Sequence, residues 1–103
     1  MSKVIFTIQY ELKEDKKEEF LSVVNELKNL LNDDGLEDYS VFKVKGKQNQ
    51  YQEQYTFQSE EAFDAFDDNN DERINILVNK LNDLTTGHST RYLTLNKIIW
   101  EPI

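Results

Sequence analysis

Residues 51–66 read YQEQYTFQSEEAFDAF, and this stretch joins a strand pattern directly to a helix pattern. Alternate residues from Tyr51 to Phe57 fall on one face of a strand, and Glu53 is the only one of them that is not aromatic. Ser59 can then cap a helix, and the acidic residues after it suit a first helical turn. The stretch therefore predicts mixed α and β structure, with a carboxylate on an aromatic face.

The segment before this stretch contains the same two patterns. Apolar residues alternate over 4–12, which predicts a strand with one strongly apolar face. Asp15, followed three residues later by Glu18, fits a capping box, and apolar residues at helical spacing follow. We expect this helix to end near Asp34, with Gly35 as its left-handed cap.

A further alternating segment and a short polar turn predict a hairpin over 38–58. If Gly46 and Gln50 flank a three-residue turn, Lys43 faces Glu53 across the two strands. Glu53 then has a structural interpretation, a cross-strand ion pair, beside a functional one.

The second half of the chain continues with a helix and a strand. The run 67–70 interrupts the second helix, apolar spacing resumes over 74–84, and Gly87 is expected to end it. Residues 90–100 form a final strand rich in β-branched and aromatic side chains. The order β-α-β-β-α-β predicts a ferredoxin-like α+β fold with a four-stranded antiparallel sheet, as a single domain over 1–103.

Composition excludes several classes of function. The net charge of −8, from 20 acidic and 12 basic residues, disfavours nucleic-acid and membrane-surface binding. No apolar stretch approaches the ~20 residues of a membrane span, and the N-terminus resembles a strand rather than a signal peptide. One histidine and no cysteine argue against a metal site, and we expect no cofactor. The lack of cysteine is compatible with the cytoplasm, which is the location we expect.

Apolar residues occur on both faces of the predicted sheet. Ile5, Phe42 and Val44 lie opposite the dominant apolar set of their strands, and Leu93 and Leu95 lie opposite the aromatic side of the last strand. Two helices cover only one face of such a sheet. The other face is therefore expected to pack on a second copy, which predicts a homodimer.

Residues in two segments carry a resemblance to a known family. The segments are KKEEFLSVVNELKNLLNDDGLEDYSVFK (16–43) and YQEQYTFQSEEAFDAF (51–66). The matching positions are Gly35, Tyr39, Phe42, Glu53, Tyr55, Glu61, Ala62 and Phe63. With the first strand, they resemble the antibiotic biosynthesis monooxygenase-like family of the dimeric α+β barrel superfamily.

The resemblance implies a homodimer whose two sheets form a barrel, with a cavity between the helices and the sheet of each subunit. It also implies a possible activity, since the family includes cofactor-independent oxygenases of hydroxyaromatic or quinone-like compounds and haem-degrading enzymes.

The chain departs from the family at two histidine positions. Phe66 stands where family members often carry a helix histidine, and Asp71 or Glu72 stands near the place of another. His88, the only histidine, matches neither position. These departures argue against haem ligation and remove an acid–base group that titrates near neutral pH.

The candidate catalytic residues are therefore Glu53 and His88. The candidate ligand-binding residues are Tyr55, Phe66, Tyr92, Asn96 and Trp100. Each also has a plainer interpretation, since aromatics on alternating strand positions are usually core and a histidine in a polar turn is usually solvated.

Two hypotheses about function follow. The first is an oxygenase acting on a small aromatic metabolite, which requires an enclosed cavity with a polar group directed into it. The second is a non-catalytic dimeric domain, ligand-binding or structural, that has lost the family's histidines and in which Glu53 simply pairs with Lys43.

Overall fold

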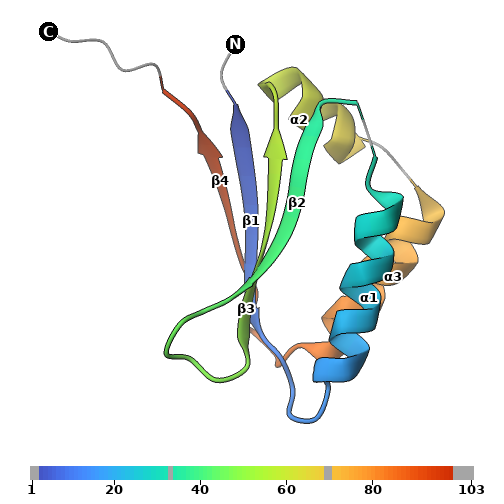
Figure 1. Cartoon of the computed structure of the whole chain (residues 1–103), viewed down its shortest axis with the longest axis vertical. Coiled ribbons are helices and arrows are strands. Elements are labelled where there is room, and N and C mark those ends of the chain that lie inside the picture. The colour runs from blue at the N-terminus through green and yellow to red at the C-terminus, as the bar shows by residue number, and fades with distance from the viewer. Residues whose placement is uncertain (1–2, 33, 69–70, 99–103) are drawn as a thin grey trace, which may run out of the picture.

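The computed structural model describes residues 3–32, 34–68 and 71–98. They form β1 (Val4–Glu11), α1 (Lys17–Leu30), β2 (Leu36–Lys43), β3 (Gln50–Phe57), α2 (Glu60–Asp68), α3 (Glu72–Leu84) and β4 (Arg91–Asn96). Figure 1 shows α1 and α3 side by side against one face of the sheet, with α2 near the end of β3. The predicted α+β class is confirmed, and the interrupted second helix is two separate helices.

The strands lie in the order β2-β3-β1-β4, and each neighbouring pair is antiparallel. This is the ferredoxin-like arrangement that the order of elements predicts. Since β3 lies between β1 and β2, its side chains have neighbours on both sides. Glu53 on β3 lies opposite Ile8 on β1 and opposite Val41 on β2.

The hydrophobic core lies between the sheet and the helices. It uses the face of β1 that carries Val4 and Tyr10, and the face of β3 that ends in Phe57. Phe20 of α1 and Leu77 of α3 are fully buried against this face. The alternation of strand residues and the helical spacing therefore identified the core side of β1, β3, α1 and α3 correctly.

The ends of α1 differ from the prediction. Asp15 has a φ of 64°, so the chain turns there, and Lys16 is the N-cap but its side chain makes no capping hydrogen bond. The expected capping box is therefore wrong. At the other end the helix stops at Leu30, because Leu31 takes an extended backbone as the chain turns back toward β2.

Gly35 does not cap α1, which ends at Leu30. Its φ is 89°, and it lies directly before β2. A Cβ atom at this position would stand 2.5 Å from the Cβ of Ala62 on α2. Gly35 therefore permits both a left-handed turn and the close approach of α2.

The second helix begins and breaks as predicted. Ser59 accepts a hydrogen bond from the Ala62 backbone N–H at 3.1 Å and so caps α2. Asp71 caps α3 by accepting from the Ile74 N–H at 3.1 Å. However, α3 ends at Leu84, before Gly87.

The predicted register of the hairpin is wrong by two residues. Lys43 lies opposite Tyr51, not opposite Glu53, and its side chain is exposed. The reason is the turn, which is closed by a 2.9 Å hydrogen bond from the Val44 N–H to the Gln50 carbonyl. A shift of two residues preserves the face of each side chain but changes its partner, so the Lys43–Glu53 ion pair does not form.

The face of the sheet away from the helices has apolar residues at its two edges. Phe42 on β2 is 50% exposed, and Leu93 and Leu95 on β4 are 57% and 46% exposed. Between them lie polar residues such as Gln9 and Gln52, whose side chains are hydrogen-bonded to each other at 3.3 Å. The predicted two-sided apolar character is therefore present. In the described part of the chain, no helix combines the length and apolar character that a membrane crossing needs.

Candidate active site

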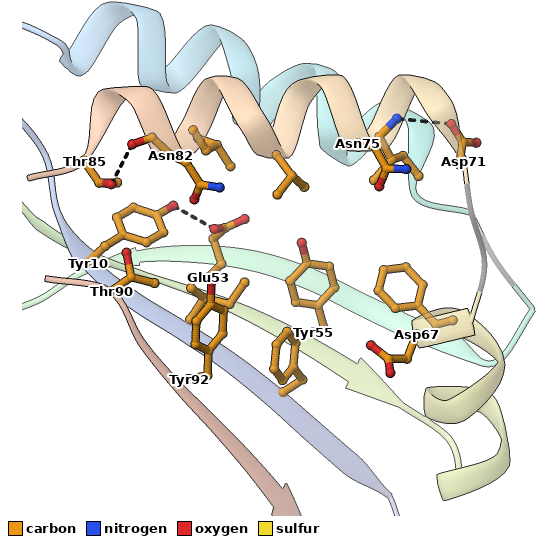
Figure 2. A pocket seen from close by; sticks show the side chains of 16 residues that line it. Tyr10, Glu53, Tyr55, Asp67, Asp71, Asn75, Asn82, Thr85, Thr90 and Tyr92 are labelled. Carbon is orange, nitrogen blue, oxygen red and sulfur yellow. Dashed lines mark hydrogen bonds between the residues drawn. The ribbon is translucent and has the colours of Figure 1, made fainter. Parts of the chain in front are cut away.

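A cavity of about 260 Å³ lies between the sheet and α3. The sheet contributes aromatic and aliphatic side chains together with Glu53, and α3 contributes Asn75, Asn82 and several aliphatic residues. Figure 2 shows Glu53 and Tyr55 rising from the sheet toward the helix, which carries the two asparagines on the opposite wall. A largely apolar cavity with a few polar groups is the usual form of a small-molecule site.

Glu53 is the most unusual residue of this cavity, because it is a carboxylate that is only 2% exposed. The Tyr10 hydroxyl donates to its Oε2 at 2.8 Å, and the Tyr39 hydroxyl donates to its Oε1 at 2.6 Å. Each carboxylate oxygen therefore has one tyrosine donor and retains a further lone pair. Tyr10 lines the cavity with Glu53, whereas Tyr39 is not among the lining residues.

The sheet brings these three residues together through diagonal pairing. Tyr10 lies opposite Tyr51, two residues from Glu53 along β3, and Tyr39 lies opposite Tyr55, two residues the other way. Diagonal neighbours on one face of a sheet are within reach of long side chains. The two tyrosines therefore approach Glu53 from different strands and from opposite directions.

Burial controls the protonation of this group. Loss of solvation raises the pKa of Glu53 above its ordinary value, and the hydrogen bonds from Tyr39 and Tyr10 oppose that rise. The pKa values of Tyr10, Tyr39 and Tyr55 are also raised, mainly by burial and then by the nearby Glu53 charge. The tyrosines therefore remain hydrogen-bond donors, and Glu53 is the group suited to exchange a proton.

Tyr55 belongs to a group of aromatic side chains that pack on one another beside Glu53. Its ring centroid lies 4.8 Å from that of Tyr39, 5.8 Å from that of Phe6 and 5.6 Å from that of Phe66. Phe6 in turn stacks on Tyr92 at 6.2 Å. These contacts give a flat ligand several ring faces to pack against.

Comparison with known proteins assigns the fold and these segments to a family. A family model described as antibiotic biosynthesis monooxygenase matches residues 3–71. The chain belongs to the antibiotic biosynthesis monooxygenase family. The match includes Tyr10, Tyr39 and Glu53 but stops at the start of α3. A search of the curated proteins gives no match.

Solved structures with the same fold match nearly the whole chain. SnoaB of Streptomyces nogalater, a cofactor-independent oxygenase, is 15% identical, has a TM-score of 0.77, and aligns over 100% of both chains. A Caulobacter crescentus protein is 15% identical with a TM-score of 0.80, over 95% of this chain and 92% of the other. A conserved Methanosarcina mazei protein is 14% identical with a TM-score of 0.78, over 92% of each chain. At such identities the likeness establishes the fold alone.

The structure of this family member brings together some of the residues that the sequence singled out. Glu53, Tyr55, Phe66 and Tyr92 all line the cavity. His88 does not line it; it is exposed in the turn before β4 with a φ of 64°.

The two remaining candidates are placed differently. Asn96 is exposed at the end of β4 and is not among the lining residues. Trp100 lies outside the described residues.

Sequence reasoning missed the hydrogen bonds of Tyr10 and Tyr39 to Glu53, and it missed Asn75 and Asn82 as lining residues. The alternation pattern already placed Tyr10, Tyr39 and Glu53 on one face, but the incorrect hairpin register concealed that Tyr39 is a diagonal neighbour of Glu53. For the asparagines the helical pattern gave no signal, because polar residues on a surface helix usually face solvent.

The cavity residues do not form a metal site. Across residues 3–32, 34–68 and 71–98, no three His, Cys, Asp or Glu side chains are grouped so that they could hold a metal ion. Glu53 and its two tyrosine partners offer the chemistry of a buried carboxylate with two phenol donors.

Proposed function

We propose that this protein is a cofactor-independent oxygenase of a small hydroxyaromatic or quinone-like metabolite, with Glu53 as its acid–base group. The observation that supports the proposal is the position of Glu53, a buried carboxyl that lines an aromatic cavity in a member of the monooxygenase family. A raised pKa makes such a carboxyl a better proton acceptor than an exposed glutamate.

The proposed reaction begins with proton transfer from the substrate to the Glu53 carboxylate, which leaves an electron-rich enolate or phenolate. Electrons pass from this anion to dioxygen, a carbon–oxygen bond forms, and the proton held by Glu53 returns to the distal oxygen to give a hydroperoxide. Loss of water then leaves a carbonyl, so one oxygen atom enters the product and the other enters water. Dioxygen accepts all the electrons that the substrate loses.

The tyrosines have a separate part in this proposal. Tyr10 and Tyr39 hold the two oxygens of Glu53 and limit the rise of its pKa, so that the carboxylate form is accessible. They act on the carboxylate rather than on dioxygen. Tyr55, Phe66 and Tyr92 supply ring faces that position a flat substrate.

A thermal-shift screen with hydroxyquinones, flavonoid-like phenols, haem and reduced flavin tests this function, with oxygen uptake recorded for each hit. A ligand at about a hundred times its Kd stabilises the fold by roughly 2.7 kcal/mol. We expect a phenolic hit with oxygen uptake that Glu53→Gln abolishes and that the exposed Glu60→Gln control retains. Binding without oxygen uptake would contradict the proposal.

The alternative is a non-catalytic ligand-binding domain, and one observation favours it. The resemblance implies a histidine at the place of Phe66 and another near Asp71 or Glu72, whereas here Phe66 and Asp71 line the cavity. In this alternative Glu53 only orients a bound hydroxyl group, and Glu53→Gln weakens binding without altering any reaction.

We further propose that the protein is a homodimer in the cytoplasm. The support for a dimer is the outer face of the sheet, on which Phe42, Leu93 and Leu95 are each exposed by about half. A second copy packed on this face removes these side chains from water and completes the barrel that the family resemblance implies.

A further inference from the structure

The charges around the cavity differ from those of the chain as a whole. Among the residues that the structure describes, its lining contains three carboxylates, Glu53, Asp67 and Asp71, and no lysine, arginine or histidine. The chain has 12 Lys and Arg residues, so their absence from the lining reflects where the fold places them. Arg73, two residues from Asp71, is held in an ion pair with Glu26 of α1.

The three carboxylates come from three elements and occupy two regions of the cavity. Figure 2 shows Asp71 at the start of α3 and Asp67 across the cavity from it beside α2, both away from Tyr10 and Thr90, while Glu53 lies nearer to Tyr10 and Thr90. Asp67 and Asp71 are exposed, so they form a rim, whereas Glu53 is buried. The cavity thus has an acidic rim at one end and a buried carboxyl in its interior.

The helix dipoles act differently on the two rim residues. Asp67 lies in the last turn of α2, where the dipole adds negative potential. Asp71 is the N-cap of α3, where the dipole offsets part of its charge. The rim is therefore negative overall, and Asp67 contributes more than Asp71.

Aromatic faces lie between the rim and Glu53. Tyr55 and Phe66 line the cavity with their ring centroids 5.6 Å apart, and Phe66 directly precedes Asp67 in the chain. The face of an aromatic ring attracts a cation, and a carboxylate at the same place strengthens that attraction. Among the described residues, no side chain that lines the cavity carries a positive charge that could attract an anion.

From this arrangement we infer that the cavity takes a flat aromatic amine, with its rings against Tyr55 and Phe66 and its ammonium group at the Asp67–Asp71 rim, and that it rejects anionic aromatics. This deepens the proposed function by naming a substrate class, and it rests on that proposal only in using the same cavity. Aromatic carboxylates and haem, with its propionate groups, are disfavoured because nothing in the lining neutralises them.

A matched ligand series tests the charge preference without depending on catalysis. Naphthylethylamine, naphthylethanol and naphthylacetate share a ring system and differ in the charge of the side chain. They lack a phenol hydroxyl, so they bind without the proposed oxygen chemistry. By titration calorimetry in low salt, we expect the amine to bind at least about tenfold more tightly than the carboxylate, with the alcohol between them.

Variants of the rim identify the source of the preference. Asp67→Asn should reduce the ratio of amine to carboxylate affinity several-fold, and the double variant with Asp71→Asn should reduce it further. Asparagine is also a good N-cap, so α3 is retained. The control is Asp64→Asn, an exposed aspartate of α2 outside the lining, which should leave the ratio unchanged.

Salt provides a second measurement that does not require any substitution. Because exposed charges are screened within about 10 Å at 0.1 M ionic strength, the preference for the amine should shrink as salt is added. Equal or tighter binding of naphthylacetate, a ratio unaffected by the rim variants, or no binding of any of the three compounds would overturn the inference. None of these results would exclude oxygen uptake with an uncharged phenol, so the two proposals fail separately.

Discussion

Glu53 owes its properties to two diagonal neighbours and to burial. An isolated carboxylate in an apolar interior is strongly unfavourable, and the hydroxyl donors of Tyr10 and Tyr39 reduce that penalty without removing it. The result is a carboxyl with one hydrogen-bond donor on each oxygen and a pKa that is still raised. In the ion pair with Lys43 that the hairpin pattern predicted, Glu53 would have only a structural role.

Tyr39 donates a hydrogen bond to Glu53 but does not line the cavity. A substitution of Tyr39 therefore tests the support of Glu53 without removing a lining residue. In Tyr39→Phe we expect a further rise in the pKa of Glu53, because a hydrogen bond that lowers it is lost. Stability at neutral pH should fall by about 1–3 kcal/mol, since one carboxylate oxygen loses its donor. The measurement is a carbon-13 NMR titration of the Glu53 carboxyl. Tyr51→Phe, another buried tyrosine of the sheet, is the control and should leave the Glu53 pKa where it is.

The raised pKa of Glu53 also links stability to pH. The native protein holds the Glu53 proton more tightly than the unfolded chain, whose ordinary value is 4.5. The associated stabilisation is complete below that value and is lost as pH rises through the folded pKa.

As the pH rises from 4.5 through the folded pKa of Glu53, we therefore expect the wild-type protein to lose stability relative to Glu53→Gln, because glutamine does not ionise. Denaturant unfolding of both proteins from acid to neutral pH measures the difference between their free energies of unfolding. The contributions of the other carboxylates are the same in both proteins and cancel in this difference. A constant difference across the series would show that the pKa of Glu53 is not raised.

At the scale of elements, the contact between α2 and the turn that precedes β2 depends on a glycine. Gly35 combines a φ of 89° with a place where a Cβ atom would stand 2.5 Å from Ala62. Since α2 carries Phe66 and Asp67, this contact helps to position one end of the cavity.

We predict that Gly35→Ala lowers the free energy of unfolding by about 2–4 kcal/mol, through backbone strain and overpacking together. Gly46 has a φ of 80° but open space around it, so Gly46→Ala should lower the free energy of unfolding by only about 1 kcal/mol. Gly87→Ala has neither problem and should change stability little. Chemical denaturation of the three variants gives the order, and equal effects at Gly35 and Gly46 would argue against the contact with Ala62.

At the scale of the whole molecule, the sheet has one covered face and one face that the described residues leave open. The core fills the covered side, while Phe42, Leu93 and Leu95 expose apolar surface at the two edges of the other. Apolar surface of this kind on a regular sheet is typical of an interface.

We expect Leu93→Asp combined with Leu95→Asp to convert the proposed dimer to a monomer, because two charges on the outer face oppose its burial. Size-exclusion chromatography with light scattering at several concentrations measures the change. Ile76→Asp, on an exposed position of α3, is the control and should not alter the mass. A wild-type protein that stays monomeric at micromolar concentration would contradict the proposed assembly.

The sequence by itself determined the elements, their order and the buried face of β1, β2 and β3, because alternation, helical spacing and the Ser59 cap are local properties of the chain. It also identified Glu53, Tyr55, Phe66 and Tyr92 as residues to examine. Only the tertiary structure decided that Glu53 bonds to two tyrosines, which are 43 and 14 positions away in the sequence. The turn before Gln50 sets the strand register, and α3 completes the cavity. Contacts between distant segments depend on such register and packing, which no local pattern encodes.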